Sequence, residues 1–352
     1  MTVLRSVQQR KIRGEGRDVY KGQEFSIGIV CPYFGRLEPE HMKLWYQCCA
    51  HNPDIDFIII SDDAELEKRK RPDNVRFIWM TWESCSQRIQ NLYDFHIALQ
   101  YKYKICDLRP AFGEIFREYL QDYTFWGHMD VSDTLFGNLR KFVTDDILRS
   151  RDKIHMYGHF VLYRNTEEVN ARYKINLKSG KSYKDVFMLE ETMCFDDMYH
   201  EISICQIYRE NRFSKIDRIP MLVSDILPYY YSFWCSQDQG RKIPRAYEWE
   251  KGMLTEITLE GGEICRQEIG YVHYQKRKID HHLAGETDHY YLVPNSIVPV
   301  GEVSVSSAWL EEISRDKLYL DPLVGRIKRI YNYAKNPKVF LRKFRATVKS
   351  GN

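Results

Sequence analysis

Two carboxylates at the end of an apolar segment are the residues of this sequence best suited to chemistry. Asp130 and Asp133 follow the apolar run 125–129. Carboxylate oxygens are hard ligands, so a strand that ends in this way can hold Mg²⁺ or Mn²⁺ and, through the ion, a diphosphate. Two Asp residues at a strand end also form turns and cap helices, and this alternative has the same spacing.

Other groups that bind metals or nucleotides lack the spacing that those functions require. His281, His282 and His289 lie in a polar stretch without a zinc motif, which indicates a solvated loop. The nine Cys residues include no CxxC pair, which favours reduced thiols. No GxGxxG follows the first predicted strand and no GxxxxGK[ST] occurs, so a dinucleotide-binding Rossmann domain and a P-loop NTPase are disfavoured.

The elements that must position the two carboxylates form an alternation of strands and helices. Apolar, β-branched runs predict strands at 25–31, 55–60 and 75–80, the first ended by Pro32. Helical periodicity predicts helices at 38–51 and 84–99, and a hairpin is predicted around Gly261 and Gly262 from strands 255–259 and 263–268. The alternation predicts an α/β fold with a mostly parallel central sheet flanked by helices. Ligands of such sheets bind outside the carboxyl ends of the strands.

Four stretches resemble a bacterial family of GT-A-type glycosyltransferases of capsule and surface-polysaccharide synthesis. They are KICDLRPAFG (104–113), WGHMDVSDTLFGN (126–138), GHFVLYRN (158–165) and YVHYQKRK (271–278). The resemblance covers about residues 25 to 280 and implies a GT-A-like nucleotide-diphospho-sugar transferase fold with a DxD-type metal motif. Here Asp130 and Asp133 are separated by two residues where that motif has one, and Ser132 lies between them.

The resemblance implies a metal site and a donor site. Asp130 and Asp133 would bind Mn²⁺ or Mg²⁺, with His273 as the third protein ligand. The residues implied to contact the nucleotide-sugar donor are Pro32, Tyr33, Phe34, Asp62, Asp107, Arg109 and Lys276. The loop 32–34 would pack on the base and ribose, and Lys276 would meet pyrophosphate oxygens.

Each of these roles has a structural alternative in the residue types alone. The aromatic side chains at 33 and 34 can pack beneath the next helix. Asp107 and Arg109 can form an ion pair on a helix surface, although their spacing does not make them face each other. A single His in an apolar strand, such as His273, is usually a core residue.

The acceptor half offers Asp196 and Asp197 as candidate general bases. Their aromatic flanks predict partial burial, which favours them over Glu190 and Glu191. An inverting transfer needs a carboxylate that takes the proton of the acceptor hydroxyl, whereas a retaining transfer does not. A helix cap or a solvated turn is the alternative for this pair.

Composition predicts a globular body with a basic tail. The chain has 352 residues, of which 43% are hydrophobic, and the longest aliphatic runs are too short to span a bilayer. Of its 52 basic residues nine follow residue 325, where no acid occurs, so the rest of the chain is mildly acidic and unlike a nucleic-acid binder. Apolar residues at helical spacing in 323–348 predict basic amphipathic helices that bind an anionic membrane surface or pack on the body.

These observations predict a domain order and a location. Residues 1–22 form a mobile basic lead-in, 23–292 a GT-A-like catalytic domain, and 293–352 a C-terminal extension. Within the catalytic domain the nucleotide-sugar half spans about 23–140 and the acceptor half about 141–292. Because the N-terminus lacks an apolar signal segment, we expect a cytoplasmic protein that is peripheral on the inner face of the membrane.

The predicted function is a hexosyltransferase that moves a sugar from a UDP-sugar to a growing, lipid-linked surface or capsular polysaccharide precursor. A non-catalytic nucleotide-sugar or glycan-binding protein of the same fold is the alternative. A metal-dependent hydrolase of phosphate esters would also use paired carboxylates, but it explains neither the strand-loop motifs nor the aromatic richness.

Overall fold

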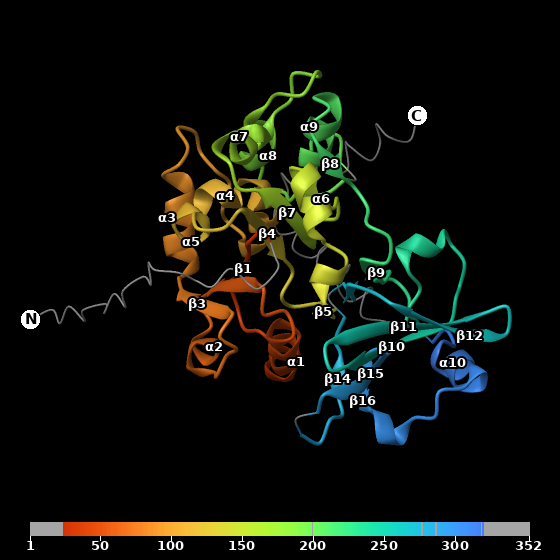
Figure 1. The fold of residues 1–352 in the computed structure, drawn as a ribbon. Helices are drawn as coiled ribbons and strands as arrows, with labels where there is room; N and C mark the ends of the chain where they lie inside the picture. The colour runs from red at the N-terminus through yellow and green to blue at the C-terminus, as the bar shows by residue number, and fades with distance from the viewer. Residues whose placement is uncertain (1–23, 199, 276, 286, 318, 320–352) are drawn as a thin grey trace, which may run out of the picture.

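Seven strands form the central sheet, which lies between two layers of helices and loops (Figure 1). The computed structural model describes residues 24–198, 200–275, 277–285, 287–317 and 319. The strand order is β3 (Val75–Trp79), β2 (Ile55–Ser61), β1 (Ile27–Tyr33), β4 (Phe125–Met129), β7 (Phe160–Arg164), β6 (Lys153–Ile154) and β8 (Lys215–Ile216). The three strands predicted before residue 81 are confirmed as β1, β2 and β3.

The central sheet is mixed, so the predicted mostly parallel sheet holds in part: four of the six pairings among its described strands are parallel and two are antiparallel. Strands β3, β2, β1 and β4 pair in parallel, whereas β7 is antiparallel to both β4 and β6. Only residues 155–159 connect β6 to β7, and a connection this short permits antiparallel pairing alone. This turn also brings Gly158 and His159 to the end of β4, where the Asp130 amide donates to the His159 carbonyl at 2.9 Å.

Strand β1 continues through Pro32 to Tyr33, two residues further than predicted. Its pairing with β4 stops at Val30, so among the described strands only β2 pairs with β1 at Pro32. A proline is tolerated there because the side of the strand that faces away from β2 needs no ladder donor. The unpaired end of β1 leaves space between β1 and β4.

The sheet is buried on both faces because successive residues of its strands enter opposite cores. Ile29 and Ile59 belong to the core that includes helix α1 (Pro39–Ala50), whereas Val30 and Ile58 face the core that includes α3 (Trp82–Gln90). This period of two is the pleat of the strand. Each fully buried aliphatic side chain contributes about 1.5–3 kcal/mol to the free energy of unfolding.

Helix α1 agrees with the prediction for 38–51, but α3 ends at Gln90 and not at residue 99. The Gln90 side chain donates to the Phe95 carbonyl at 2.8 Å and accepts from the Ile97 amide at 3.0 Å. These bonds stabilise a loop where helical periodicity continues in the sequence. The loop leads to the 3₁₀ helix η1 (Lys102–Ala111), which carries Arg109.

Short helices complete the two layers. They are α2 (Ala64–Lys68), α4 (Phe112–Ile115), α5 (Arg117–Leu120), α6 (Asp145–Ser150), α7 (Glu167–Ala171), α8 (Tyr183–Phe187) and α9 (Ile204–Glu210), with the 3₁₀ turns η2 (Leu139–Lys141) and η3 (Arg172–Lys174). No helix in the described ranges is long and apolar enough to cross a bilayer.

Two smaller sheets lie beside the central sheet (Figure 1). One has the order β5 (Thr134–Phe136), β13 (Tyr271–His273) and β9 (Val223–Asp225), and it is followed by the turn η4 (Ser236–Asp238). The other has the order β12 (Glu263–Glu268), β11 (Met253–Glu260), β10 (Arg245–Glu250), β15 (His289–Val293), β16 (Ser296–Pro299) and β14 (Asp280–His281). The predicted hairpin is confirmed by the antiparallel pairing of β11 with β12.

After residue 292 the chain adds strand β16 to the six-stranded sheet. The turn η5 (Val300–Glu302) and helix α10 (Ser307–Ile313) follow. Leu310 of α10 is buried in the same apolar cluster as Ala246 and Ile257 of the sheet. The predicted lead-in 1–22 and the predicted tail helices 323–348 lie outside the described residues.

Candidate active site

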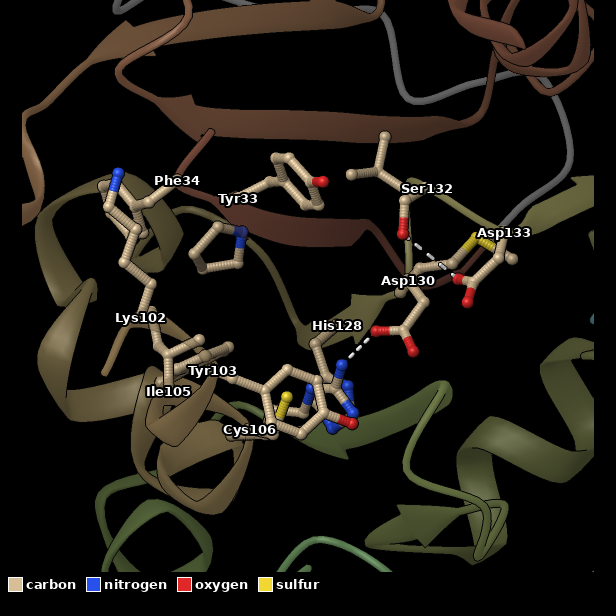
Figure 2. A pocket seen from close by; sticks show the side chains of 15 residues that line it. Tyr33, Phe34, Lys102, Tyr103, Ile105, Cys106, His128, Asp130, Ser132 and Asp133 are labelled. Atoms are coloured by element: carbon tan, nitrogen blue, oxygen red, sulfur yellow. Dashed lines mark hydrogen bonds and ion pairs between the residues drawn. The ribbon is translucent and has the colours of Figure 1, made fainter. Parts of the chain in front are cut away.

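A cavity of about 270 Å³ opens where β1 and β4 separate at their carboxyl ends (Figure 2). Figure 2 shows Tyr33 and Phe34 on one side, Asp130 and Asp133 at a polar end, and on another side Lys102, Tyr103, Ile105 and Cys106. The full lining is Pro32, Tyr33, Phe34, Lys102, Tyr103, Ile105, Cys106, Arg109, Phe112, His128, Met129, Asp130, Val131, Ser132 and Asp133. The cavity is therefore aromatic along its sides and acidic at one end.

The polar end is completed by His273, which comes from a distant part of the chain. Strand β13 pairs with β5 so that His273 lies opposite Thr134, and the Tyr274 amide donates to the Asp133 carbonyl at 3.0 Å. His273 Nε2 is 3.8 Å from the Asp133 carboxylate, and one possible ligand atom each from Asp130, Asp133 and His273 lie within 4.8 Å of one another. Two carboxylates and one imidazole fit a hard or borderline divalent cation such as Mn²⁺ or Mg²⁺.

A second possible ligand group overlaps the first and consists of His159, Asp225 and His273. The Asp225 carboxylate already accepts hydrogen bonds from His273 Nδ1 at 2.8 Å, Gln275 at 3.0 Å and Ser236 at 3.0 Å. Because these donors occupy Asp225, it is less available as a ligand than Asp130, whose side chain is 24% exposed at the cavity. The arrangement favours the group at the cavity.

Negative charge around His273 changes its titration. Burial opposes protonation of the ring, but the hydrogen bond to Asp225 and the charges of Asp133 and Asp130 outweigh burial, so the pKa of His273 is raised. Burial acts to raise the pKa of Asp225, but the hydrogen bonds from His273, Gln275 and Ser236 together with the charge of His273 outweigh it, so this pKa is lowered. Both shifts favour the charged forms of the two side chains.

Arg109 connects the acidic end to the predicted acceptor side. Its guanidinium forms an ion pair with Asp130, donates to Asp196 at 2.7 Å, and donates to the Gly158 carbonyl at 2.7 Å. Burial raises the pKa of Asp196 to about 7, against the opposing effect of Arg109. Burial also raises the pKa of Asp197, which accepts from the Met198 amide at 2.6 Å. Asp196 therefore lies next to the cluster and titrates near neutrality.

A family model described as "Family of unknown function (DUF6625)" matches residues 29–300, which include every element of the cavity. The chain belongs to this family. Mouse xyloside xylosyltransferase 1, in its apo form, is a similar solved structure, with a TM-score of 0.35 and 9% sequence identity over 61% of this chain and 90% of that chain. No curated protein matches the sequence.

In this DUF6625 protein some of the residues predicted to contact the nucleotide-sugar donor line the cavity and others do not. Pro32, Tyr33, Phe34 and Arg109 line it. Phe34 also packs edge-on against Trp82 of α3 with ring centroids 5.2 Å apart, so its ring has a packing role, and its contact with the nucleotide stays a prediction.

Asp107 and Asp62 are engaged elsewhere. The Asp107 side chain is fully buried, pairs with Lys104 at 2.8 Å and accepts from the backbone amides of Met193 and Phe195. Asp107 thus anchors the segment that carries Asp196 and does not reach the cavity. Asp62 accepts from the Gly35 amide at 2.8 Å and from Lys102 at 3.0 Å, which ties the loop after β1 to the cavity rim. Lys276 lies outside the described residues.

The sequence-based prediction missed several residues of the DUF6625 site. Lys102 and Tyr103 line the cavity although they precede the recognised motif 104–113, and Cys106 lines it although it was not singled out within that motif. Asp225 was missed although it ends a short strand with the same Ser-Asp pattern as residues 132–133. A carboxylate at a strand end is the signal that could have identified Asp225, as it identified Asp130.

Proposed function

We propose that this DUF6625 protein is a metal-dependent glycosyltransferase that moves a hexosyl group from a nucleotide-sugar, with UDP as the nucleotide, to a saccharide acceptor. The observation that carries the proposal is the convergence of Asp130, Asp133 and His273 at one end of an aromatic-lined cavity. A nucleoside diphosphate has a flat base at one end and a diphosphate at the other. The cavity has matching chemistry along its length.

The walls of the cavity support binding of the nucleoside. Tyr33 and Tyr103 offer ring surfaces, and Tyr103 is 53% exposed in this structure. Aromatic rings stack on bases with about 1–3 kcal/mol per base. Lys102 adds a cation near the opening, where it is paired with Asp62.

The acidic end supports diphosphate chemistry. Asp130, Asp133 and His273 would hold Mn²⁺ or Mg²⁺, which when bound stabilises the charge that grows on the leaving nucleoside diphosphate. Arg109 is half-buried next to Asp130 and supplies a fixed positive charge at the same end. In an inverting transfer the Asp196 carboxylate accepts the proton of the acceptor hydroxyl. Its ion pair with Arg109 holds it next to the acidic end of the cavity.

The acceptor is proposed from the sequence resemblance. A growing surface or capsular polysaccharide precursor that is linked to lipid would lie at the inner face of the cytoplasmic membrane. The basic segment 323–348 would bring the enzyme to that anionic surface, with an attraction of about 1 kcal/mol per cation.

The proposal is tested by incubating the protein with a panel of nucleotide sugars, with and without Mn²⁺, and measuring free nucleoside diphosphate. We expect release from one donor class with Mn²⁺, and loss of release in excess EDTA. Asp130→Ala, checked for an unchanged melting temperature, should lose the activity. Tight UDP binding without turnover of any donor, even with saccharide acceptors, would instead favour the nucleotide-sugar or glycan-binding alternative.

A further inference from the structure

We infer that Asp225 is a positioning residue that holds His273 with its Nε2 atom directed at the Asp130 and Asp133 carboxylates. The inference rests on the proposed function, because it assigns to Asp225 the orientation of a metal ligand. Asp225 belongs to none of the recognised motifs, and it does not line the cavity.

Strand pairing places His273 between two carboxylates. In the three-stranded sheet β13 is the central strand, with β9 in parallel on one side and β5 antiparallel on the other. The register sets His273 beside Asp225 on β9 and beside Thr134, the residue after Asp133, on β5. The Asp225 carboxylate is 2.8 Å from Nδ1, whereas the Asp133 carboxylate is 3.8 Å from Nε2.

This geometry determines which ring nitrogen is free to bind a cation. An ionised carboxylate can only accept a hydrogen bond, so Nδ1 of His273 must carry the hydrogen that Asp225 accepts. In the neutral ring the lone pair then lies on Nε2, on the side of Asp133. A carboxylate on the second nitrogen also makes the imidazole a more basic ligand.

Asp225 is itself held in place by its neighbours. Ser236 donates to one carboxylate oxygen at 3.0 Å and Gln275 to the other at 3.0 Å. The Asp225 backbone amide donates to the Gln237 side chain at 3.2 Å. These hydrogen bonds hold the Asp225 carboxylate in one orientation, and its bond to Nδ1 then fixes the orientation of the His273 ring.

His159 restricts the remaining freedom of the ring. Its imidazole stacks on His273 with centroids 4.0 Å apart, and its Nδ1 is bonded to the Tyr271 hydroxyl at 2.9 Å. His273 is therefore fixed in its plane by His159 and within that plane by Asp225. This separates the role of His159, which is packing, from that of Asp225, which sets the tautomer.

The experiment compares wild-type protein with Asp225→Asn. Mn²⁺ affinity is measured by electron paramagnetic resonance, and the His273 ring of metal-free protein is observed by ¹⁵N NMR. Loss of an outer-shell carboxylate typically weakens metal binding by about 10–100-fold, and we expect a loss in that range. The wild-type spectrum should show hydrogen on Nδ1 when the ring is neutral, and the variant should lose this preference.

The matched control is Asp316→Asn, which removes a carboxylate that is bonded to Trp234 at 3.0 Å and to Lys242 at 2.7 Å outside the cluster. It should leave both readouts unchanged. A folded Asp225→Asn variant with Mn²⁺ affinity within twofold of wild type, or a neutral wild-type ring with its hydrogen on Nε2 and not on Nδ1, overturns the inference. A wild-type protein that binds no Mn²⁺ contradicts the proposed function instead, and the NMR spectrum still decides the role of Asp225.

Discussion

Ser132 and Asp133 differ in what each offers a cation, although both face the acidic end of the cavity. The Ser132 hydroxyl donates to the Asp133 carboxylate at 3.3 Å, so it orients a ligand and is a poor ligand itself. We expect Asp130→Ala and Asp133→Ala to lower metal-dependent turnover by about 100-fold or more, as the loss of several kcal/mol of charge stabilisation implies. Ser132→Ala should cost about fivefold or less, the value of one neutral hydrogen bond.

Donor turnover and melting temperature of the three variants provide the check. If Ser132→Ala abolishes metal-dependent turnover while Asp133→Ala retains it, the ligand pair is Asp130 with Ser132 and our assignment is wrong.

The raised pKa of Asp196 predicts an acidic limb in the pH profile. Only the ionised carboxylate accepts a proton, so kcat/KM at saturating Mn²⁺ should fall about tenfold per pH unit below about 7. The same shift affects stability. Between about pH 4 and 7 the Asp196 carboxyl is protonated in the folded protein and ionised in the unfolded chain, so the folded protein binds one more proton. The free energy of unfolding therefore falls as pH rises through that window. The limb should persist in Asp197→Asn. A profile that is flat from pH 5 to 8 would exclude Asp196 as the base.

Lys276 remains a predicted phosphate contact. Lys276→Ala should weaken binding of UDP more than binding of uridine, because only UDP carries the pyrophosphate that a cation meets. Calorimetry with both ligands measures the difference. Equal losses for the two would indicate a contact with the base or a folding defect.

At the scale of elements, the close approach of β4 to β7 positions Asp130. A Cβ atom at Gly127 would overlap the Val161 carbonyl oxygen and the Leu162 side chain, and the backbone atom has little freedom to move. Gly127→Ala should therefore lower the free energy of unfolding by about 1–3 kcal/mol and reduce turnover, since Asp130 directly follows the last residue of β4. Urea denaturation measures the change.

Gly301→Ala serves as the control, because a Cβ there meets no atom within 4 Å among the described residues. It should change the free energy of unfolding by less than about 0.5 kcal/mol. Equal stability of the two variants would show that β4 and β7 can separate without cost.

For the whole molecule, we predict that the basic C-terminal segment binds anionic membranes. Truncation after Pro322 removes all nine cations that follow residue 325. We expect full-length protein to sediment with anionic vesicles at low salt and less at high salt, and the truncated protein to stay in solution while it still turns over donor. Failure of the full-length protein to sediment, or unfolding on truncation, would remove the membrane role.

Much of the fold could be predicted because local patterns report local structure. The strands from Ile27 to Trp79, helix α1 and the hairpin at Gly261 follow from apolar periodicity and turn residues, which depend on near neighbours. The loop after Gln90 could not be predicted, since its hydrogen bonds replace a helix that the periodicity alone favours.

The sequence by itself identified candidate residues for the chemistry: two carboxylates at a strand end are visible as residue types, whereas His273 was implied as a ligand by the family resemblance. Asp130, Asp133 and His273 were predicted as a group, and the structure brings them together. Only the tertiary structure decided which side chains pair. Arg109 joins Asp130 to Asp196, and Asp225 holds His273. Asp107 pairs with Lys104 and stays away from the cavity. Such pairs depend on which strands become neighbours and in which register, and this is set by packing between segments far apart in the chain.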